Sequence, residues 1–333
     1  MRVIVPMAGL GKRMRPHTLT TPKPLIPVAG KPIVQHLMEY LAEIAGDHIK
    51  HIAFIIGDFG KETEKNLLKI AEDIGATSSI HYQDEPLGTA HAILCAQEHL
   101  KERVIIAFAD TLFYTDFKIP EKADGVIWVK KVDNWQQFGV VKVGKEGYIM
   151  EFVEKSPTYV SDLAIIGIYY FKDGENLRCE LQHLIDHDIK EKGEYQLTTA
   201  MEHMKNKGKK LFPGEVSEWL DCGNKDATVD TNRAVLEHKK NERLIDKSAL
   251  IENSTIIPPS FIGANAIIRN SVIGPHVSIG EKTLAENCII KNSIIQSSSR
   301  IKNRLINNSM IGNHVTINGH PDEFSVGDYS TGL

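Results

Sequence analysis

Two hydrophobic patterns divide the chain near residue 240. In the first part, short apolar runs alternate with segments whose apolar residues recur every three or four positions, which is typical of strands alternating with helices. Strands are expected at Val3–Val5, His51–Gly57, Ser79–Tyr82, Arg103–Ala109, Gly125–Val129, Ile165–Phe171 and Lys210–Val216. Helices are expected at Val34–Ala45, Glu62–Ile74, Ala90–Leu100, Leu177–Lys190 and Asp226–Arg243. This alternation predicts an α/β, Rossmann-like three-layer fold: a mostly parallel sheet with helices on both faces and a ligand crevice at the carboxyl ends of the strands.

After Lys247 an aliphatic residue recurs every five or six positions, with small and turn-forming residues between. The recurring positions are Leu250, Ile256, Ile262, Ile268, Ile273, Ile279, Ile290, Ile295, Ile301, Ile306, Ile311 and Ile317, and the step Leu284-Ala285 continues the rhythm more weakly. Neither a helix nor an ordinary strand has this period, whereas hexapeptide repeats of a parallel β-helix do. We therefore predict two domains: residues 1–240, and a β-helix domain at residues 241–333 that ends in a tail.

Composition sets the broad class of protein. The chain has 333 residues, of which 42% are hydrophobic and 25% charged, with a net charge of −4. These values are ordinary for a globular protein and argue against a nucleic-acid partner. No apolar run predicts a signal peptide or a membrane span, so we expect no membrane association. The cysteines lie too far apart in sequence for a zinc or redox motif, and the simplest interpretation is a reduced cytoplasmic protein; they are Cys95, Cys179, Cys222 and Cys288.

The loop after the first strand, "PMAGLGKRMRPHTLTTPKPLIP", combines glycines, basic residues and prolines. It lacks the spacing of a Walker A loop, and Met14 occupies the third glycine position of a dinucleotide fingerprint. Its physical chemistry still suits an anion, because Gly9 and Gly11 let backbone N–H groups approach it and Arg13 and Lys23 add charged donors. A solvated basic turn is the alternative.

Three more constellations follow predicted strands. In "HYQDEPLGTAHAI", the amide of Gln83 offers a donor and an acceptor, and the backbone of Gly88 could lie against a planar ring. Asp110 ends the strand in "IIAFADTLF", and Asp221 precedes a glycine in "SEWLDCGN". Each aspartate alone suits a helix cap or a turn, but two of them near a phosphate-type loop favour a magnesium site. A hairpin is expected in Phe138–Pro157, ending in a charged pair.

The ordered set of motifs resembles the sugar-1-phosphate nucleotidyltransferase family, which makes nucleotide-sugars from a nucleoside triphosphate and a sugar 1-phosphate. The resemblance covers the chain to about residue 240. It rests on "AGLGKRMRPHTLTTPKPLIPVAGKPI", "QDEPLGTAHAI", "FADTLF", "FGVV", "FVEK" and "EWLDCG". Several family members also carry a carboxyl-terminal left-handed β-helix, which matches the second pattern.

The resemblance implies a role for particular residues. Ala8 (in place of the family's first glycine), Gly9 and Gly11 would bind the nucleotide phosphates, and Gln83 and Gly88 the base. The remaining roles are catalysis for Arg13, Lys23 and Lys155, with Arg13 and Lys23 also binding pyrophosphate; sugar-phosphate binding for Gly139, Glu154 and Lys155; and Mg²⁺ binding for Asp110 and Asp221. The implied substrates are dTTP or UTP and glucose 1-phosphate, as in glucose-1-phosphate thymidylyltransferases and UDP-glucose pyrophosphorylases.

Several alternatives follow from departures from the family pattern. Lys12, Cys222 and Ser156 replace residues common in the family, so the sugar stays open. The base also stays open, because the amide of Gln83 could face guanine as well as uracil or thymine, and a mannose-1-phosphate guanylyltransferase is one alternative. A catalytically silent regulatory subunit would fit if Asp110, Asp221, Arg13 or Lys23 were missing, but all four are present. The β-helix could instead be an acyltransferase, although its histidines have no recognisable catalytic context. We expect it to have a structural role in a homo-oligomer.

Overall fold

The computed structural model describes the whole chain except residues 10, 45–47, 321–322, 324, 330 and 332–333. It contains two compact units. The first combines Met1–Ile26 with Pro32–Gly223, and the second combines Pro27–Lys31 with Asn224–Leu333. Each unit is described by itself below.

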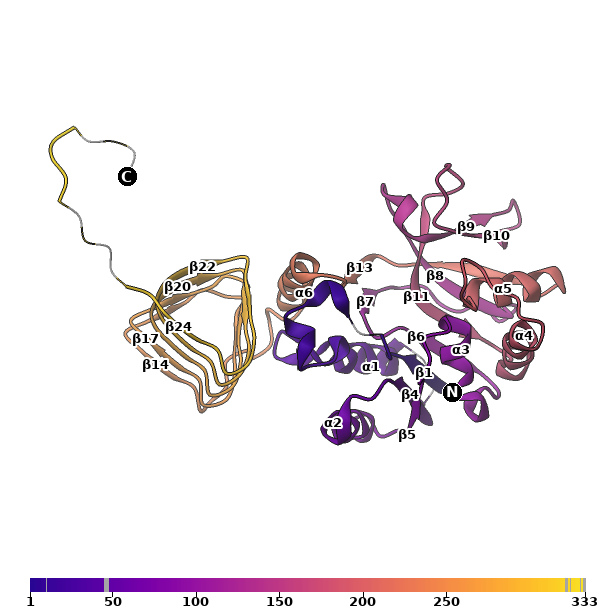
Figure 1. The fold of residues 1–333 in the computed structure, drawn as a ribbon, viewed down its shortest axis with the longest axis horizontal. Coiled ribbons are helices and arrows are strands. Elements are labelled where there is room, and N and C mark those ends of the chain that lie inside the picture. Colours follow the sequence, from indigo (N-terminus) through magenta and orange to yellow (C-terminus); the bar gives the residue numbers. More distant parts are fainter. Residues whose placement is uncertain (10, 45–47, 321–322, 324, 330, 332–333) are drawn as a thin grey trace. The chain divides into compact units, whose positions relative to one another are not determined.

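The first unit is built on a nine-stranded sheet (Figure 1). Seven strands follow one another in the order β10-β9-β11-β6-β1-β4-β5, and β8 pairs with both β11 and β12. The strands are β1 (Arg2–Pro6), β4 (His51–Ile56), β5 (Thr77–Tyr82), β6 (Val104–Ala107), β8 (Gly125–Lys131), β9 (Gly139–Val143), β10 (Ile149–Glu154), β11 (Leu163–Phe171) and β12 (Leu211–Glu215). The half β6-β1-β4-β5 is parallel, whereas β11 runs antiparallel to β6, β8 and β9. The expected parallel sheet is therefore a mixed one.

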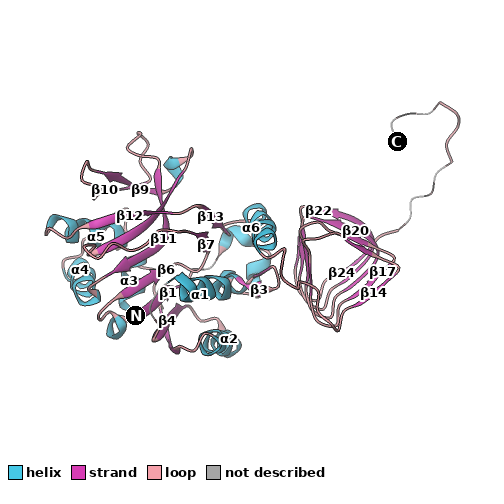
Figure 2. Cartoon of the chain, turned by 180° about the vertical axis from the view of Figure 1, so that it is seen from behind, coloured by secondary structure: helices cyan, strands magenta, loops and turns pink. Residues whose placement is uncertain are grey.

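Helices cover both faces of this sheet, which confirms the three layers expected from the sequence. Helices α1 and α2 lie on one face, and α3, α4 and α5 on the other (Figures 1 and 2). The bounds are α1 (Ile33–Ile44), α2 (Gly60–Asp73), α3 (Thr89–Leu94), α4 (Gly174–Asp186) and α5 (Leu197–Asn206). The core consists of buried aliphatic residues between these layers, such as Ile4, Ile55 and Ile106.

The predicted elements of this unit are confirmed with shifted ends, apart from two differences in the helices. The helix expected at Ala90–Leu100 ends at Leu94, and after a break a 3₁₀ turn, η4, spans Gln97–His99. Helix α5 was not expected, although its buried residues Leu197, Ala200, Met201 and Met204 have the spacing of an amphipathic helix. The last residue of the first expected helix, Ala45, lies outside the described residues.

Short elements connect the strands to the site. Three 3₁₀ turns, η1 (Lys12–Met14), η2 (His17–Leu19) and η3 (Lys23–Leu25), follow β1. Strands β7 (Thr111–Tyr114) and β13 (Glu218–Asp221) form a separate antiparallel pair. A further turn, η5 (Trp135–Gln137), precedes β9. Among the described helices, none combines the length and the apolar composition needed to cross a bilayer.

The second unit contains a three-sided parallel β-helix, as the repeat predicts (Figure 1). Its strands pair only in parallel with strands of neighbouring coils. They are β14 (Leu250–Glu252), β15 (Thr255–Ile256), β16 (Phe261–Ile262), β17 (Ile267–Arg269), β18 (Val272–Ile273), β19 (Val277–Ile279), β20 (Leu284–Lys291), β21 (Ser293–Ile295), β22 (Arg300–Asn307), β23 (Met310–Ile311) and β24 (Thr316–Asn318). A short pair, β2 (Pro27–Val28) and β3 (Lys31–Pro32), lies at the junction of the two units in the sequence.

The recurring aliphatic residues form the core of this β-helix, one stack for each side. Ile268, Ala285, Ile301 and Ile317 lie in register along one side. The other stacks are Ile256-Ile273-Ile290-Ile306 and Ile262-Ile279-Ile295-Ile311. One expected core position is wrong: Leu250 pairs with Ile267 on the outer surface and is 42% exposed, whereas Ile251 is in register with Ile268.

Asparagines occupy one corner of successive coils. Asn253, Asn270, Asn287 and Asn303 all have a left-handed backbone conformation, which asparagine tolerates better than most residues. Their side-chain amides are hydrogen-bonded in sequence from coil to coil, at distances of 2.8, 3.3 and 2.9 Å. The corner residues therefore both permit the turn and link the coils.

Helix α6 (Lys225–His238) belongs to the second unit, although the sequence pattern places it before the predicted boundary at residue 240. Its buried Asn232 accepts hydrogen bonds from the backbone N–H of Ala29 and from the hydroxyl of Ser278. The helix is thus tied to the β-helix and to residues Pro27–Lys31. Whether the chain divides functionally at residue 240 stays a prediction.

Candidate active site

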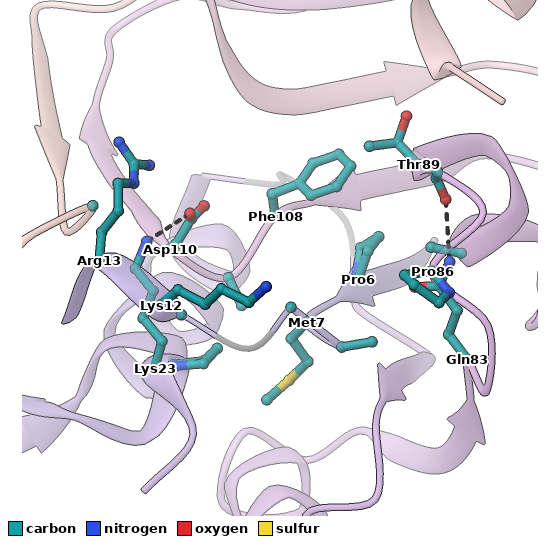
Figure 3. Close-up of a pocket in the computed structure, with 18 of the residues that line it drawn as sticks. Pro6, Met7, Lys12, Arg13, Lys23, Gln83, Pro86, Thr89, Phe108 and Asp110 are labelled. Carbon is teal, nitrogen blue, oxygen red and sulfur yellow. Dashed lines mark hydrogen bonds and ion pairs between the residues drawn. The ribbon is translucent and has the colours of Figure 1, made fainter. Parts of the chain in front are cut away.

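A cleft of about 470 Å³ opens at the carboxyl ends of the parallel strands β1, β5 and β6 (Figure 3). It gathers most of the residues that the sequence predicts as ligands of a nucleotide. Ala8, Gly9, Gly11, Arg13, Lys23, Gln83, Gly88 and Asp110 all line it. These residues come from three separate loops, so the fold supplies the proximity that the sequence only suggests.

The loop after β1 forms the floor of one end of the cleft. Gly11 has φ = 57°, and a Cβ there would lie 3.0 Å from the side chain of Thr18 and 3.1 Å from that of Lys23, so a larger residue would be both strained and crowded. The hydroxyl of Thr18 donates to the carbonyl oxygen of Gly11 at 2.8 Å and fixes the turn. No described atom lies within 4 Å of a Cβ built on Gly9. A ligand can therefore approach the backbone closely at that point.

Lys23 is held rigidly at this end. Its residue is only 8% exposed, and its Nζ lies 2.8 Å from Oδ2 of Asp110. Pro22 and Pro24 flank it and restrict the backbone of the 3₁₀ turn η3. The ammonium group is thus oriented before any ligand binds, which lowers the entropic cost of binding an anion.

The two predicted metal-binding aspartates are brought together by the β7–β13 pair. Asp221 is in register with Thr111, the residue after Asp110, and the backbone N–H of Cys222 donates to the carbonyl oxygen of Asp110 at 3.1 Å. Burial raises the pKa of Asp221, the nearby Asp110 carboxylate raises it further, and Lys23 and Arg13 act in the opposite direction. Asp221 therefore lies in the electrostatic field of Asp110, Lys23 and Arg13.

These aspartates fit a divalent cation. Mg²⁺ is commonly held by one or two carboxylates and completes its shell with phosphate oxygens and water. A partly buried carboxylate whose pKa is raised by a second carboxylate carries an electrostatic cost, and a divalent cation would offset that cost. Asp110 shares one oxygen with Lys23, and its side chain is 44% exposed and accessible from the cleft.

Gln83 lies at the other end of the cleft, directly after β5. Its Nε2 lies 3.2 Å from the carbonyl oxygen of Gly88 and 3.2 Å from Nδ1 of His91. Because both amide hydrogens have partners in this orientation, which is assigned from the hydrogen bonds, the amide presents its oxygen to a ligand. The sequence suggested that Gln83 offers both a donor and an acceptor to a ligand. In this orientation only the acceptor, the amide oxygen, is available.

Gly88 is required for packing as well as for access. It has φ = 117°, and a Cβ there would lie 2.4 Å from the carbonyl oxygen of Tyr195. The segment around Tyr195 is tied to this loop, because its N–H donates to Leu87 and its carbonyl oxygen accepts from Ala90, each at 2.9 Å. The wall of the base-binding end is therefore built partly by residues far away in sequence.

The predicted sugar-phosphate residues form a group of their own. Strands β9 and β10 form the expected hairpin, in which Glu154 is in register with Gly139. Lys155 follows in a left-handed conformation, with its Nζ 3.6 Å from Oε1 of Glu154. None of the three lines the 470 Å³ cleft as delimited by the described residues. Their role in binding a sugar phosphate stays a prediction.

Sequence reasoning missed several residues that line the cleft. Phe108, Thr89 and Glu194 contribute to its walls. Phe108 donates its backbone N–H to Gly167 at 3.0 Å, where the pairing of β11 with β8 is irregular. The apolar run ending in Asp110 could have indicated Phe108, which comes two residues earlier. Glu194 gave no comparable signal, because it lies between the helix expected at Leu177–Lys190 and the strand expected at Lys210–Val216, in a stretch without a recognised motif.

The fold and the cleft define a nucleotidyltransferase of the α/β class. The sequence profile of the family described as "Nucleotidyl transferase" matches residues 2–238, and the chain belongs to this family. Nucleotidyltransferases of this family generally use divalent metal ions, in agreement with the paired aspartates.

Characterised relatives extend this result. The chain is similar to the low-salt glycan biosynthesis nucleotidyltransferase Agl11 of Haloferax volcanii, with 30% identity over 72% of this chain and 67% of that protein. It is 32% identical to the bifunctional protein GlmU of Methanocaldococcus jannaschii, over 77% of this chain but only 60% of that protein. A glucose-1-phosphate thymidylyltransferase of Streptomyces griseus is 27% identical over 99% of this chain and 98% of its own length.

A solved structure supports the fold. A Bacillus anthracis protein named as a glucose-1-phosphate thymidylyltransferase, crystallised with sucrose, matches with a TM-score of 0.59 over 70% of this chain and 94% of that chain. The sequence identity is 24%, so the likeness concerns the fold of the aligned part.

Proposed function

We propose that this protein transfers the nucleotidyl group of dTTP or UTP to glucose 1-phosphate and releases pyrophosphate. The observation that carries the proposal is the convergence of a glycine loop, Arg13, Lys23, Asp110 and the amide oxygen of Gln83 in one cleft. Asp221 does not line this cleft as delimited by the described residues, but the β7–β13 pair holds it beside Asp110. The end-to-end match to a thymidylyltransferase supports the choice of substrates.

The proposed reaction is an in-line displacement at the α-phosphorus. A phosphate oxygen of the sugar 1-phosphate forms the new P–O bond, the bond between the α-phosphorus and the bridging oxygen breaks, and its electron pair leaves with pyrophosphate. The nucleophile is already ionised at neutral pH, so no general base is needed. The main barrier is repulsion between two polyanions, which at 4 Å amounts to about 4 kcal/mol per unit-charge pair at an effective dielectric of about 20.

The cations of the chain reduce this repulsion. Lys23, oriented by Asp110, and Arg13 at the glycine loop would bind the β- and γ-phosphates and stabilise the charge that develops on pyrophosphate. Lys155 would bind the phosphate of the sugar, and Gly139 and Glu154 the sugar itself. Mg²⁺ held by Asp110 and Asp221 would supply further charge neutralisation along the triphosphate.

The base-binding end favours a base with an N–H opposite Gln83. The amide oxygen can accept from N3–H of thymine or uracil, and also from N1–H of guanine. We propose a pyrimidine because the full-length relative is a thymidylyltransferase. A thymine methyl group discriminates by only about 1–3 kcal/mol in an apolar pocket, so use of both dTTP and UTP is expected.

A grid of nucleoside triphosphates and sugar 1-phosphates, followed by coupled detection of pyrophosphate, tests the proposal. We expect the highest kcat/KM for dTTP or UTP with glucose 1-phosphate. A preference for GTP with mannose 1-phosphate would overturn the base assignment, and no pyrophosphate release with any pair would favour a silent binding subunit.

We also propose that the protein is a cytoplasmic homo-oligomer that associates through the β-helix. Val272, Ile289 and Leu305 form an outward row across three coils, and Ile289 and Leu305 are 52% and 76% exposed. Apolar rows of this kind are commonly covered by a partner. Light scattering should show that Leu305→Glu lowers the molar mass of the assembly; an unchanged mass would remove the case for this face.

A further inference from the structure

Three histidines and a glutamate gather at the edge of the nine-stranded sheet, outside the cleft. His51 lies at the start of β4, His81 near the end of the edge strand β5, and Glu98 and His99 in the 3₁₀ turn η4. The rings of His51 and His99 are stacked with centroids 4.1 Å apart. Nothing in nucleotidyl transfer requires this group, so its chemistry needs a separate explanation.

One serine hydroxyl organises the cluster. Oγ of Ser79 lies 2.8 Å from Nε2 of His51, 2.8 Å from Nε2 of His81 and 3.1 Å from Nε2 of His99. A hydroxyl donates one hydrogen bond and accepts two. Two of these ring nitrogens must therefore carry hydrogen, and the third must accept.

Thr77 fixes which nitrogen accepts. Its hydroxyl donates to the carbonyl oxygen of Lys50 at 2.8 Å, so it accepts from Nδ1–H of His51, also at 2.8 Å. His51 then accepts from Ser79 through Nε2, and Ser79 accepts from Nε2–H of His81 and of His99. These tautomers are assigned from the network. They place the lone pair of His81 on Nδ1, the atom that faces Glu98.

The spacing of these groups suits a tetrahedral metal ion. Oε1 of Glu98 lies 3.7 Å from Nδ1 of His81 and 3.8 Å from Nε2 of His99, and all three atoms lie within 4.8 Å of one another. Ligands about 2.0–2.1 Å from a tetrahedral Zn²⁺ are roughly 3.3 Å apart, so small side-chain movements are sufficient. A set of two imidazoles and one carboxylate suits zinc better than it suits magnesium.

We propose that His81, Glu98 and His99 bind a divalent transition-metal ion, Zn²⁺ by its ligand chemistry, at the edge of the sheet. His99 exchanges its hydrogen bond to Ser79 for the metal, and its proton moves to Nδ1. His81 keeps its Nε2–H bond to Ser79, which is the support from outside the ligand shell that metal-bound histidines usually have. The side chains of His81 and His99 are 12% and 17% exposed and that of Glu98 is 56% exposed, so solvent provides the entry route.

The metal would join the two ends of the segment that binds the base. His81 precedes Gln83 by two residues, and Glu98 and His99 follow helix α3, which begins directly after Gly88. Arg2 contacts the backbone carbonyl of Glu98 at 3.5 Å and helps to hold the η4 turn near the strand. The bound metal would therefore stabilise this segment and take no part in the reaction.

Metal titration of the full chain tests the proposal. Chelator-treated protein is titrated with Co²⁺ and with Zn²⁺ in excess Mg²⁺, which saturates the aspartate site. We expect one equivalent of Co²⁺ with the intense visible absorption of tetrahedral coordination, its displacement by Zn²⁺, and a Zn²⁺-dependent rise in Tm. Failure to bind one equivalent, or a weak octahedral spectrum, would overturn the proposal.

Two variants assign the site. Glu98→Gln keeps the size of an exposed side chain and should weaken Zn²⁺ binding by at least about tenfold, while pyrophosphate release with Mg²⁺ is unchanged. The control is His187→Ala, which removes the residue that follows α4; its ring packs against that of His183 on the last turn of α4, with centroids also 4.1 Å apart. Unchanged binding in Glu98→Gln, or its loss in His187→Ala, would show that the metal lies elsewhere.

Discussion

The cleft and the β-helix obtain their structure in opposite ways. In the β-helix, each buried isoleucine contacts residues one coil away, and the same arrangement repeats along the domain. In the cleft, Lys23, Gln83 and Asp110 come from separate loops. They line one cavity only because the carboxyl ends of β1, β5 and β6 lie side by side in the sheet. The repeat therefore predicts that each coil contributes separately to the stability of the β-helix. The chemistry of the cleft depends instead on single residues, none of which is repeated elsewhere in it.

The largest expected effect is in the cleft. Asp110→Asn and Asp221→Asn should each lower kcat by about a thousandfold, since each removes a carboxylate from the proposed metal site and several kcal/mol of charge stabilisation. Steady-state pyrophosphate release over a range of Mg²⁺ concentrations measures this. Near-normal Mg²⁺-dependent turnover in both variants would contradict the metal assignment.

The β-helix should respond in stability and not in chemistry. Ile290→Ala removes a fully buried side chain and should cost about 3 kcal/mol of unfolding free energy. Lys291→Ala, on the other side of Ile290 in the chain, changes an exposed side chain outside the apolar row; it is the control and should change this free energy by less than about 0.5 kcal/mol. Denaturant unfolding compares the two. Equal effects would show that the stacks do not carry the stability of this unit.

A glycine pair separates crowding from backbone strain at the base-binding end. Gly88→Ala should destabilise its loop by about 1–3 kcal/mol and raise the nucleotide KM, because the new Cβ meets Tyr195. Gly75 follows helix α2, outside the lining of the cleft, and also has a positive φ, of 83°. No described atom lies within 4 Å of a Cβ built there, so Gly75→Ala should leave the KM unchanged. If both variants raise KM equally, the contact with Tyr195 is not what positions the base.

Removing the amide of Gln83 should have a moderate effect on binding. Gln83→Ala should raise the nucleotide KM by about 3–10-fold, corresponding to about 0.5–1.5 kcal/mol for one hydrogen bond. The effect should be similar for dTTP and UTP, which share the N3–H group. A KM that stays the same for both nucleotides would place the base elsewhere.

The smallest expected effect is the pH dependence of the contribution of Asp221 to stability. The raised pKa of Asp221 means that the folded state favours the neutral carboxyl group. The ionised carboxylate therefore lowers the stability of the fold at pH values above this pKa, and this loss disappears as the pH falls through the pKa. Asp221→Asn should therefore raise Tm slightly at neutral pH without metal. Calorimetry at neutral and acidic pH checks this, and a lower Tm for Asp221→Asn would contradict the direction of the pKa shift.

The sequence predicts what repeats and what is local. Strand positions, the β-helix core and the cleft-lining loops all follow from periodicity or from compact motifs. The packing of Gly88 against Tyr195 could not be predicted, because the two are more than a hundred residues apart and neither is part of a periodic pattern. The same holds for the convergence of His81 and His99 on Ser79, which depends on the break that ends α3 at Leu94. Leu250 was misassigned because Ile251, beside it, is equally aliphatic.

The number of residues per coil indicates where this domain can gain or lose residues. Ile262 and Ile279 are seventeen residues apart, but Ile279 and Ile295 are sixteen apart. The shorter step falls at one corner, where Gly274-Pro275 in one coil corresponds to the single residue Lys291 in the next, and the stacks above and below keep their register. A one-residue deletion is absorbed at a corner, whereas a deletion within a strand would displace every later coil. Over evolutionary time such a domain can vary in length at its corners or by whole coils, while the strands that form its three sides keep their length and register.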